Sequence, residues 1–117
     1  MSRLTTHVLN TAHGKPGQGI RIDLYKIVDN KSNLLLSKLT NHDGRCDSPL
    51  LEGPAFQEGV YELHFHIGEY FSGLGIRLPT PNFLDIVILR FGVADASQHY
   101  HVPLVTTPWS YSTYRGS

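Results

Sequence analysis

Hydrophobic and polar residues alternate along much of the chain, which is the pattern of a strand with one buried face. Residues 20–24 show it clearly, because charged Arg21 and Asp23 separate three apolar residues. Successive side chains of a strand point to opposite faces of its sheet, so one face of this segment is apolar throughout. We therefore predict that Ile20, Ile22 and Leu24 point into the core.

The same alternation predicts about eight short strands and little helix. Besides residues 20–24, strands are expected at residues 5–9, 34–39, 59–67, 84–91, 100–106 and 109–114, with a less regular one near 47–51. Segments rich in Gly, Pro, Asn and Asp separate them, a spacing typical of all-β sandwiches. One helix of a turn or two is expected at residues 69–74, closed by Gly75, as a connector between strands.

The composition fits a single domain spanning residues 1–117 and argues against several partners. Ten Lys and Arg balance ten Asp and Glu, so the chain lacks the basic surface that nucleic acid or an anionic membrane requires. No apolar run reaches the roughly 18 residues of a membrane-spanning helix, and no signal segment is recognisable. A single cysteine, Cys46, excludes an intramolecular disulfide and fits the cytoplasm.

Arg45 and Cys46 follow a turn, and each has two interpretations. Arg45 is either a solvated residue of a tight connection or a fixed cation that meets a planar anion or a developing oxyanion. An adjacent guanidinium favours thiolate character in Cys46. No base for the thiol is recognisable, so an inert, partly buried cysteine is the preferred interpretation.

Histidine is the unusual component of the composition, with seven residues. His7 shares a strand face with Thr5, and two pairs of histidines follow the spacing H-x-H, which places both rings of a pair on one strand face. The pairs are His99 with His101 and His64 with His66. Such pairs can ligate a metal, but no helical H-E-x-x-H or cysteine ligand accompanies them, so no metal site is predicted. For the second pair, the polar face of an amphipathic strand is the simpler interpretation.

The C-terminal residues 109–117 are rich in tyrosine and serine, which suggests an end held at an interface.

Three segments together resemble a known family. They are LTTHVLNTAHGKP at residues 4–16, NHDGRCD at 41–47, and HYHVPL at 99–104 followed by the terminal YRGS of residues 114–117. In these segments the chain resembles the 5-hydroxyisourate hydrolases, the transthyretin-related enzymes of urate breakdown, over essentially its whole length. The resemblance implies an all-β, two-sheet, eight-stranded transthyretin-like (prealbumin-like) sandwich with one short helix. It also implies a homotetramer, a dimer of dimers around a central channel.

The resemblance also implies a site and a reaction. His7, Arg45 and His101 match the family's catalytic positions, and His7, Arg45 and Tyr114 match its substrate-binding positions; His99 does not match a catalytic position. The implied reaction is water attack on the cyclic amide of 5-hydroxyisourate, giving 2-oxo-4-hydroxy-4-carboxy-5-ureidoimidazoline on the route from urate to allantoin. It needs no cofactor or metal, and either histidine is suited to be the base.

Two alternatives and one departure from the family pattern remain. The chain could instead be a non-catalytic transthyretin-like carrier of a small aromatic ligand, or a sandwich that sequesters metal through its H-x-H pairs. Asn10 stands where the family commonly has Asp, on the strand face opposite His7. We expect this difference to change a turn or a surface contact and to leave the chemistry unchanged.

Overall fold

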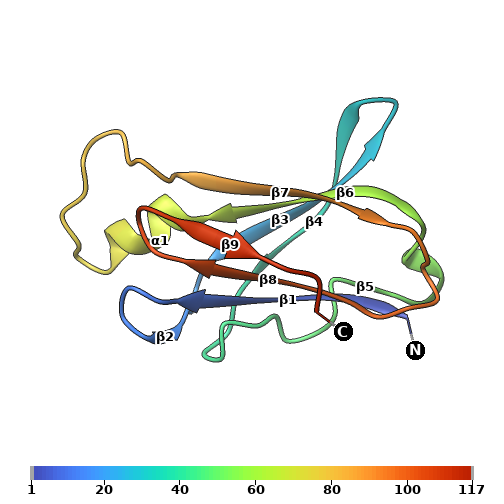
Figure 1. Ribbon diagram of the computed structural model, residues 1–117, viewed down its shortest axis with the longest axis horizontal. Helices are drawn as coiled ribbons and strands as arrows, with labels where there is room; N and C mark the ends of the chain where they lie inside the picture. The colour runs from blue at the N-terminus through green and yellow to red at the C-terminus, as the bar shows by residue number, and fades with distance from the viewer. Residues whose placement is uncertain (1, 117) are drawn as a thin grey trace.

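The computed structural model describes residues 2–116 as two β-sheets packed face to face (Figure 1). One sheet has the order β2 (Lys15–Pro16), β1 (Arg3–Asn10), β8 (Tyr100–Thr106) and β9 (Tyr111–Thr113), with β5 (Leu51–Glu52) also pairing with β1. The other has the order β4 (Lys31–Leu39), β3 (Arg21–Val28), β6 (Gly59–His66) and β7 (Ile86–Val93). A short helix, α1 (Ile67–Gly73), follows β6, and a 3-10 turn (Gly53–Ala55) follows β5. The predicted all-β sandwich with one short helix is confirmed.

The predicted strands are found, with shifts at their ends. The less regular strand near 47–51 is only the two-residue β5, and the last strand is limited to Tyr111–Thr113. The pattern missed β2, which lies in one of the Gly- and Pro-containing segments between the predicted strands. Such two-residue strands have no room to show an alternation, because a period of two needs several residues to be recognised.

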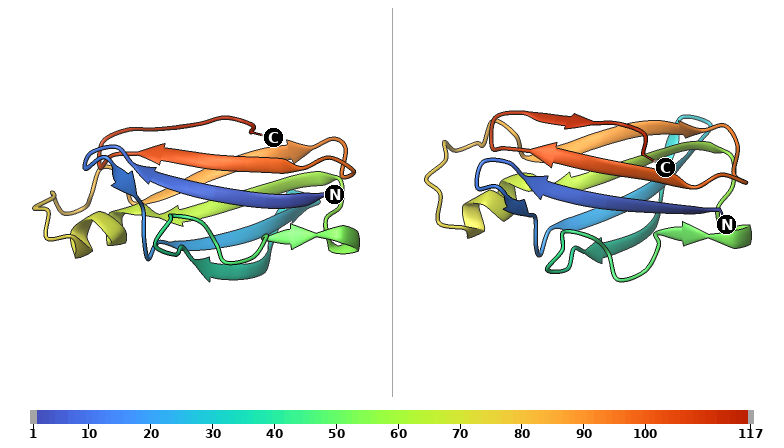
Figure 2. Two further views of the ribbon diagram at one scale, coloured as in Figure 1. Left: turned by 90° about the horizontal axis from the view of Figure 1, so that it is seen from below. Right: turned by 60° about the horizontal axis from the view of Figure 1, so that its bottom comes forward.

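One strand pair is parallel, and it positions the cleft described below. All pairs are antiparallel except β1 with β8, where Thr5 lies opposite His101 and His7 lies opposite Pro103. The paired residues of the two strands are 96 positions apart in the chain, so no local pattern specifies this register. Figure 2 shows β1 and β8 side by side, with the segment that follows β4 running along the other side of β1.

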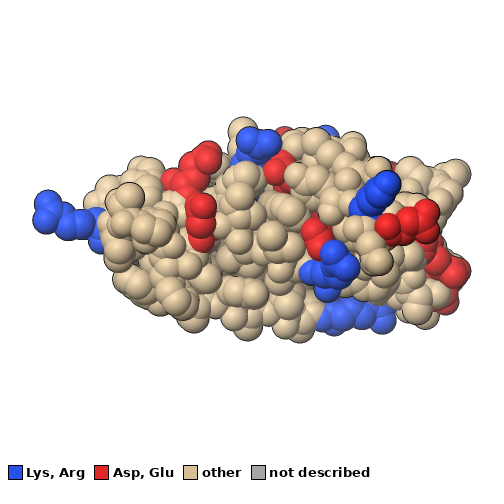
Figure 3. All heavy atoms as spheres, turned by 90° about the horizontal axis from the view of Figure 1, so that it is seen from above, with Lys and Arg blue, Asp and Glu red and all other residues tan. Residues whose placement is uncertain are grey.

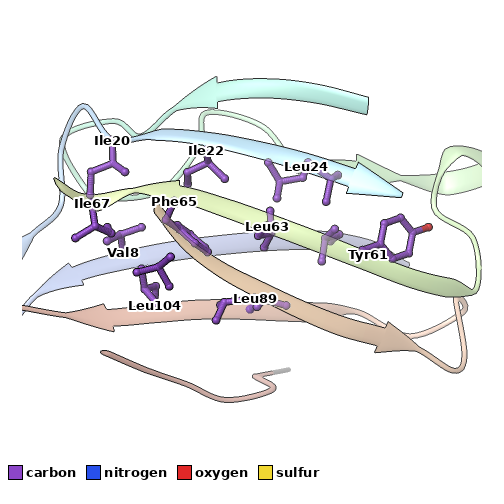
Figure 4. Packing of buried hydrophobic residues seen from close by; sticks show 14 of the residues in the cluster. Val8, Ile20, Ile22, Leu24, Tyr61, Leu63, Phe65, Ile67, Leu89 and Leu104 are labelled. Atoms are coloured by element: carbon purple, nitrogen blue, oxygen red, sulfur yellow. The ribbon is translucent and has the colours of Figure 1, made fainter. Parts of the chain in front are cut away.

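The core lies between the sheets and consists mainly of the inward-facing residues of β1, β3, β6, β7 and β8 (Figure 4). Ile20, Ile22 and Leu24 are completely buried, as predicted. Leu63 and Phe65 of β6 and Leu104 of β8 are also at 0% exposure, so apolar residues from both sheets meet in the middle. Burying each such side chain stabilises the fold by about 1.5–3 kcal/mol.

Asn10 belongs to this interior, which corrects the expectation of a surface contact. It lies on the inward face of β1 and is fully buried. Its side-chain nitrogen lies 2.8 Å from Nδ1 of His13 and donates to the Tyr70 hydroxyl at 3.1 Å, while its oxygen accepts from the His13 amide. Asn10 therefore holds the turn after β1, as expected in part, but from inside the molecule. It is not part of the cleft that contains His7.

On the face of the second sheet that points away from the core, histidine and arginine side chains form hydrogen bonds with buried carboxylates. Nε2 of His64 lies 2.9 Å from the Glu62 carboxylate, and Arg90 donates to the same carboxylate at 2.8 Å. Nε2 of His66 lies 2.8 Å from Asp23. Both histidines lie on the polar face of the strand, as predicted. Their carboxylate partners, however, are buried beneath them, with side chains only 6–10% exposed.

On the face seen in Figure 3, charged residues are scattered without a region of one sign. In this view, Lys and Arg alternate with Asp and Glu around a large uncharged area. Between residues 2 and 116, no helix is long and apolar enough to cross a membrane.

Candidate active site

The outer face of the first sheet brings polar side chains of β1 and β8 together. Leu4, Thr6 and Val8 of β1 point into the core, so Thr5 and His7 must point outward. On β8, buried Tyr100 and Val102 flank His101, which therefore also points outward. The parallel register then places these outward residues on neighbouring strands.

A tight turn presents Arg45 to this face. The side chain of Asn41 accepts hydrogen bonds from the amides of Asp43 and Arg45, and Gly44 adopts a left-handed φ of 75°. A Cβ on Gly44 would collide with the carbonyl oxygen of Val8, so only glycine permits this approach to β1. The Val8 amide donates to the Gly44 carbonyl at 2.8 Å, and His7 and Arg45 form an isolated antiparallel bridge.

The C-terminal segment closes the other side. The Gly116 amide donates to the His101 carbonyl at 2.7 Å, which ties the segment to β8. The Arg115 guanidinium lies 4.1 Å from the Tyr100 ring centroid and donates to the carbonyl of His99. These contacts hold Tyr114 at the rim, where its side chain is exposed. The segment is tied to β8 up to the last described residue, and its place at an interface stays a prediction.

These segments enclose an open cleft of about 500 Å³ that contains all four predicted site residues. Its lining is polar and is formed by Arg3, Thr5, Thr6, His7, Arg45, Cys46, Asp47, Ser48, Pro49, His99, His101 and Tyr114. The His7 and His101 rings lie 6.3 Å apart between centroids, at an angle of 39°. A small planar molecule of several ring atoms could contact both rings and the guanidinium.

Among the lining residues that were not predicted as site residues, Thr5, His99 and Arg3 form hydrogen bonds within the cleft. Thr5 Oγ1 lies 2.8 Å from Nδ1 of His101 and 3.2 Å from Nε2 of His99, and Arg3 Nε donates to Nδ1 of His99 at 3.3 Å. The alternation at Thr5 and His7 and the spacing of His99 and His101 were visible in the sequence. The signal that joins them is the β1–β8 register, which the sequence does not show.

Both central histidines are held in the neutral form. Burial lowers the pKa of His7, and the Arg45 charge lowers it further, while the backbone carbonyl and the carboxylate of Asp43 act in the opposite direction. Burial also lowers the pKa of His101, followed by the charges of Arg45, His7 and His99. A neutral imidazole has one free lone pair and one N–H, so each ring can accept a proton or donate a hydrogen bond at neutral pH.

Cys46 does not have the thiolate character that its neighbour Arg45 suggested. Burial raises the pKa of its thiol, and this outweighs the charge of Lys38, which acts in the opposite direction. The half-buried thiol is therefore protonated at neutral pH, which agrees with the preferred interpretation of an inert cysteine.

The histidine pairs do not form the core of a metal cluster in the described part of the chain. No group of three or more His, Cys, Asp or Glu side chains with ligand geometry occurs within residues 2–116. His64 and His66 each use Nε2 on a carboxylate of the second sheet. His99 and His101 are joined through Thr5.

The fold defines the class of protein. The structure of sea bream transthyretin in complex with thyroxine matches with a TM-score of 0.87 and 21% identity, covering 97% of this chain and 94% of that one. The chain is therefore a transthyretin-like β-sandwich. At this identity the likeness concerns the fold alone, and thyroxine is a ligand of the sea bream protein.

The family is more specific than the class. The model described as the HIUase/Transthyretin family matches residues 4–116, and the chain belongs to this family. It is 62% identical to a protein of Ralstonia nicotianae named 5-hydroxyisourate hydrolase, over the whole of both chains. The solved structure of (S)-allantoin synthase is 44% identical with a TM-score of 0.94, over 99% of this chain, which spans only 44% of that longer one.

Proposed function

We propose that this chain is a 5-hydroxyisourate hydrolase that acts in the cleft between β1, β8 and the turn before Arg45. The observation that carries the proposal is the meeting of His7, His101 and Arg45 in one cleft, in a chain 62% identical to a named hydrolase of this substrate. The product is 2-oxo-4-hydroxy-4-carboxy-5-ureidoimidazoline, formed on the route of urate degradation. Tyr114 at the rim is proposed to bind the substrate together with His7 and Arg45.

The chemistry assigns a task to each group. Hydrolysis of a cyclic amide requires that water lose a proton, that the attacked carbonyl oxygen carry negative charge, and that the ring nitrogen gain a proton. A neutral imidazole at His7 or His101 supplies the base, since both pKa values are lowered. The Arg45 guanidinium, which is charged at all relevant pH values, stabilises the developing oxyanion and orients the planar substrate. No cofactor or metal takes part in this scheme.

A non-catalytic carrier of an aromatic ligand is the weaker alternative. A carrier has no need for two imidazoles with lowered pKa values beside an arginine, whereas an amide hydrolase uses these groups directly. The likeness to a thyroxine-binding protein is limited to the fold, while the likeness to the named hydrolase covers the full chain.

We also propose that the chain assembles as a homotetramer, a dimer of dimers. The edge strands β7 and β9 lie on the same side of the sandwich, and an apolar cleft of about 620 Å³ opens between them. Exposed edge strands pair readily with another chain, and a second copy would cover this opening. The histidine cleft is also open, so a further copy facing it would shield the site from bulk solvent.

The proposed location is the cytoplasm. The chain has one cysteine, and its thiol is held in the protonated form, so nothing in its chemistry requires an oxidising compartment.

The first experiment follows the decay of the substrate itself. Urate oxidase generates 5-hydroxyisourate from urate, and its ultraviolet absorbance is recorded with wild-type protein and with His7→Ala. Wild-type protein should accelerate the decay above the spontaneous rate, and His7→Ala should lose about 100-fold or more in kcat, because general acid–base groups contribute this much. His42→Ala is the matched control, since the His42 side chain is 78% exposed and does not line the cleft. No acceleration by folded wild-type protein would refute the hydrolase and favour the carrier.

A further inference from the structure

A continuous row of hydrogen bonds runs along the outer face of the first sheet and ends at His101. It begins at Arg3 Nε, which donates to Nδ1 of His99 at 3.3 Å. Nε2 of His99 lies 3.2 Å from Thr5 Oγ1, which lies 2.8 Å from Nδ1 of His101. One threonine hydroxyl thus joins the two histidine rings of the H-Y-H segment.

The first donor sets the direction of every bond in this row. Arg3 can only donate, so Nδ1 of His99 must be an acceptor without a proton. Burial and the charges of Arg3 and Arg115 lower the pKa of His99, so its ring is neutral and carries its one proton on Nε2. That N–H donates a hydrogen bond to the Thr5 hydroxyl. The hydroxyl has a single hydrogen, which it uses to donate a hydrogen bond to Nδ1 of His101.

The last bond determines the tautomer of His101. Its Nδ1 accepts from Thr5, so the neutral ring carries its proton on Nε2. Nε2 has no hydrogen-bond partner within residues 2–116, and the ring lines the cleft, so this N–H is available to a ligand. His101 therefore presents a donor to the cleft and has no free lone pair there.

We propose that Thr5, supported by His99 and Arg3, is a positioning residue that holds His101 as a neutral Nε2–H donor to the substrate, which leaves His7 as the base. The inference rests on the proposed hydrolysis and assigns different roles to two histidines that are otherwise equivalent candidates. A neutral imidazole that polarises a carbonyl is an established catalytic device when a lowered pKa keeps the ring uncharged. His101 and Arg45 then stabilise the same developing oxyanion.

His7 alone accepts and returns the proton that moves during the reaction. Burial and the Arg45 charge lower the pKa of His7, and a neutral ring has one N–H and one nitrogen that can accept a proton. Water gives a proton to this nitrogen as its oxygen bonds to the amide carbon. The carbon–nitrogen bond of the ring then breaks, and the departing nitrogen takes the proton back from His7. His101 and Thr5 keep their protons throughout.

The test compares Thr5→Val with Thr5→Ser. Valine removes the hydroxyl and keeps the shape of threonine, whereas serine keeps the hydroxyl. Thr5→Val should lower kcat/KM by about 10-fold or more, since loss of an oxyanion donor costs up to 100–1,000-fold, and Thr5→Ser should retain most of the activity. Thr11→Val is the matched control, because that hydroxyl bonds a backbone carbonyl outside the cleft.

A spectroscopic readout separates positioning from a merely structural role. The 15N chemical shifts of the His101 ring distinguish the Nδ1–H and Nε2–H tautomers in the free protein. Wild-type protein and Thr5→Ser should show Nε2–H at neutral pH, and Thr5→Val should show a mixture. An Nδ1–H tautomer in wild-type protein would overturn the proposal even if Thr5→Val fails to fold.

Different experimental outcomes would refute the role of Thr5 and the proposed hydrolysis. If wild-type protein hydrolyses 5-hydroxyisourate and Thr5→Val keeps both its kcat/KM and the Nε2–H tautomer, the hydrolase stands and the role of Thr5 is refuted. If wild-type protein is inactive, the proposed function fails. The tautomer measurement then still decides whether the hydrogen-bond row orients His101.

Discussion

Arg45 acts on the two central histidines through its charge, besides the role proposed for it toward the substrate. Its guanidinium lowers the pKa of both His7 and His101, after burial, so their neutral forms persist to a more acidic pH. A base must be unprotonated to act, so activity should fall as the pH drops through the pKa of the catalytic histidine, with a midpoint below the ordinary 6.5.

Arg45→Gln should change both the rate and its pH dependence. Loss of the cation should lower kcat/KM by about 100-fold, and the acid midpoint should rise toward 6.5 because one cause of the lowered pKa is gone. The measurement is kcat/KM against pH, corrected for spontaneous decay. Arg77→Gln, in an exposed loop outside the cleft, should leave the profile unchanged. An acid midpoint that stays in place in Arg45→Gln would contradict this electrostatic role.

At the scale of elements, the turn at residues 41–45 depends on the absence of a side chain at Gly44. Gly44 and Gly14 both have left-handed φ values, of 75° and 66°, but a Cβ at Gly14 would meet nothing within 4 Å. Comparing an alanine substitution at the two positions therefore separates the cost of backbone strain from the cost of a steric collision. Only Gly44 lies against β1, next to the bridge between His7 and Arg45.

Gly14→Ala should cost about 1–2 kcal/mol of unfolding free energy, the ordinary cost of a left-handed residue with a side chain. Gly44→Ala should cost a further 1–3 kcal/mol, because the turn must move away from Val8. That movement displaces Arg45, so activity should fall in Gly44→Ala and stay near wild type in Gly14→Ala. Urea unfolding and the decay assay measure the two effects. Equal losses in both variants would show that the collision is relieved without moving Arg45.

The buried carboxylates of the second sheet make stability depend on pH. The hydrogen bond from His64 lowers the pKa of Glu62 below its ordinary 4.5, and Arg90 adds to this, although burial opposes it. A lowered folded pKa contributes stability above the unfolded pKa and loses it as the pH falls. The contribution of Glu62 is therefore complete above about pH 4.5 and declines at more acidic pH.

Glu62→Gln should cost on the order of 1–3 kcal/mol at neutral pH, since it removes a charged partner from His64 and Arg90. The cost should shrink as the pH falls below 4.5, because the unfolded wild-type chain then binds a proton at Glu62 that the folded chain binds only at a more acidic pH. Urea unfolding at several pH values measures this difference. Glu58→Gln is the matched control, because the exposed Glu58 side chain makes no described ion pair. A cost independent of pH would show that packing, not charge, is the cause.

At the scale of the whole molecule, the side of the sandwich between the edge strands β7 and β9 exposes an apolar cleft. Tyr111 of β9 is 45% exposed and lines the apolar cleft there with Phe91 and Val102. A monomer this small buries a modest share of its surface, so covering this edge with a second copy would add to the stability of each chain.

Tyr111→Lys should dissociate the proposed tetramer by placing like charges at the interface. Light scattering after size exclusion should show smaller species, and activity per chain should fall with the loss of assembly, because the histidine cleft is then no longer shielded from bulk solvent. Leu35→Lys, on β4 at the opposite edge of its sheet, is the matched control and should leave both unchanged. Fully active monomers of Tyr111→Lys would contradict a site that needs the assembly.

The sequence by itself determined the strands and the side of each strand that is buried. Alternation is a local property, so it placed Ile20, Ile22 and Leu24 in the core and Thr5 and His7 together on the outer face. The turn with Arg45 was equally visible, because Asn, Asp and Gly have conformational preferences that need no partner. The resemblance to a family added which of these residues to follow.

The tertiary structure alone decided which groups meet. The parallel register of β1 and β8 puts the Thr5 hydroxyl between His99 and His101, and the approach of Gly44 to Val8 brings Arg45 to His7. It also placed Asn10 inside the molecule and gave His64 and His66 buried carboxylate partners. These relations join residues that are far apart in the chain. Their hydrogen bonds and pKa values depend on distances in space, and no periodicity along the sequence specifies such distances.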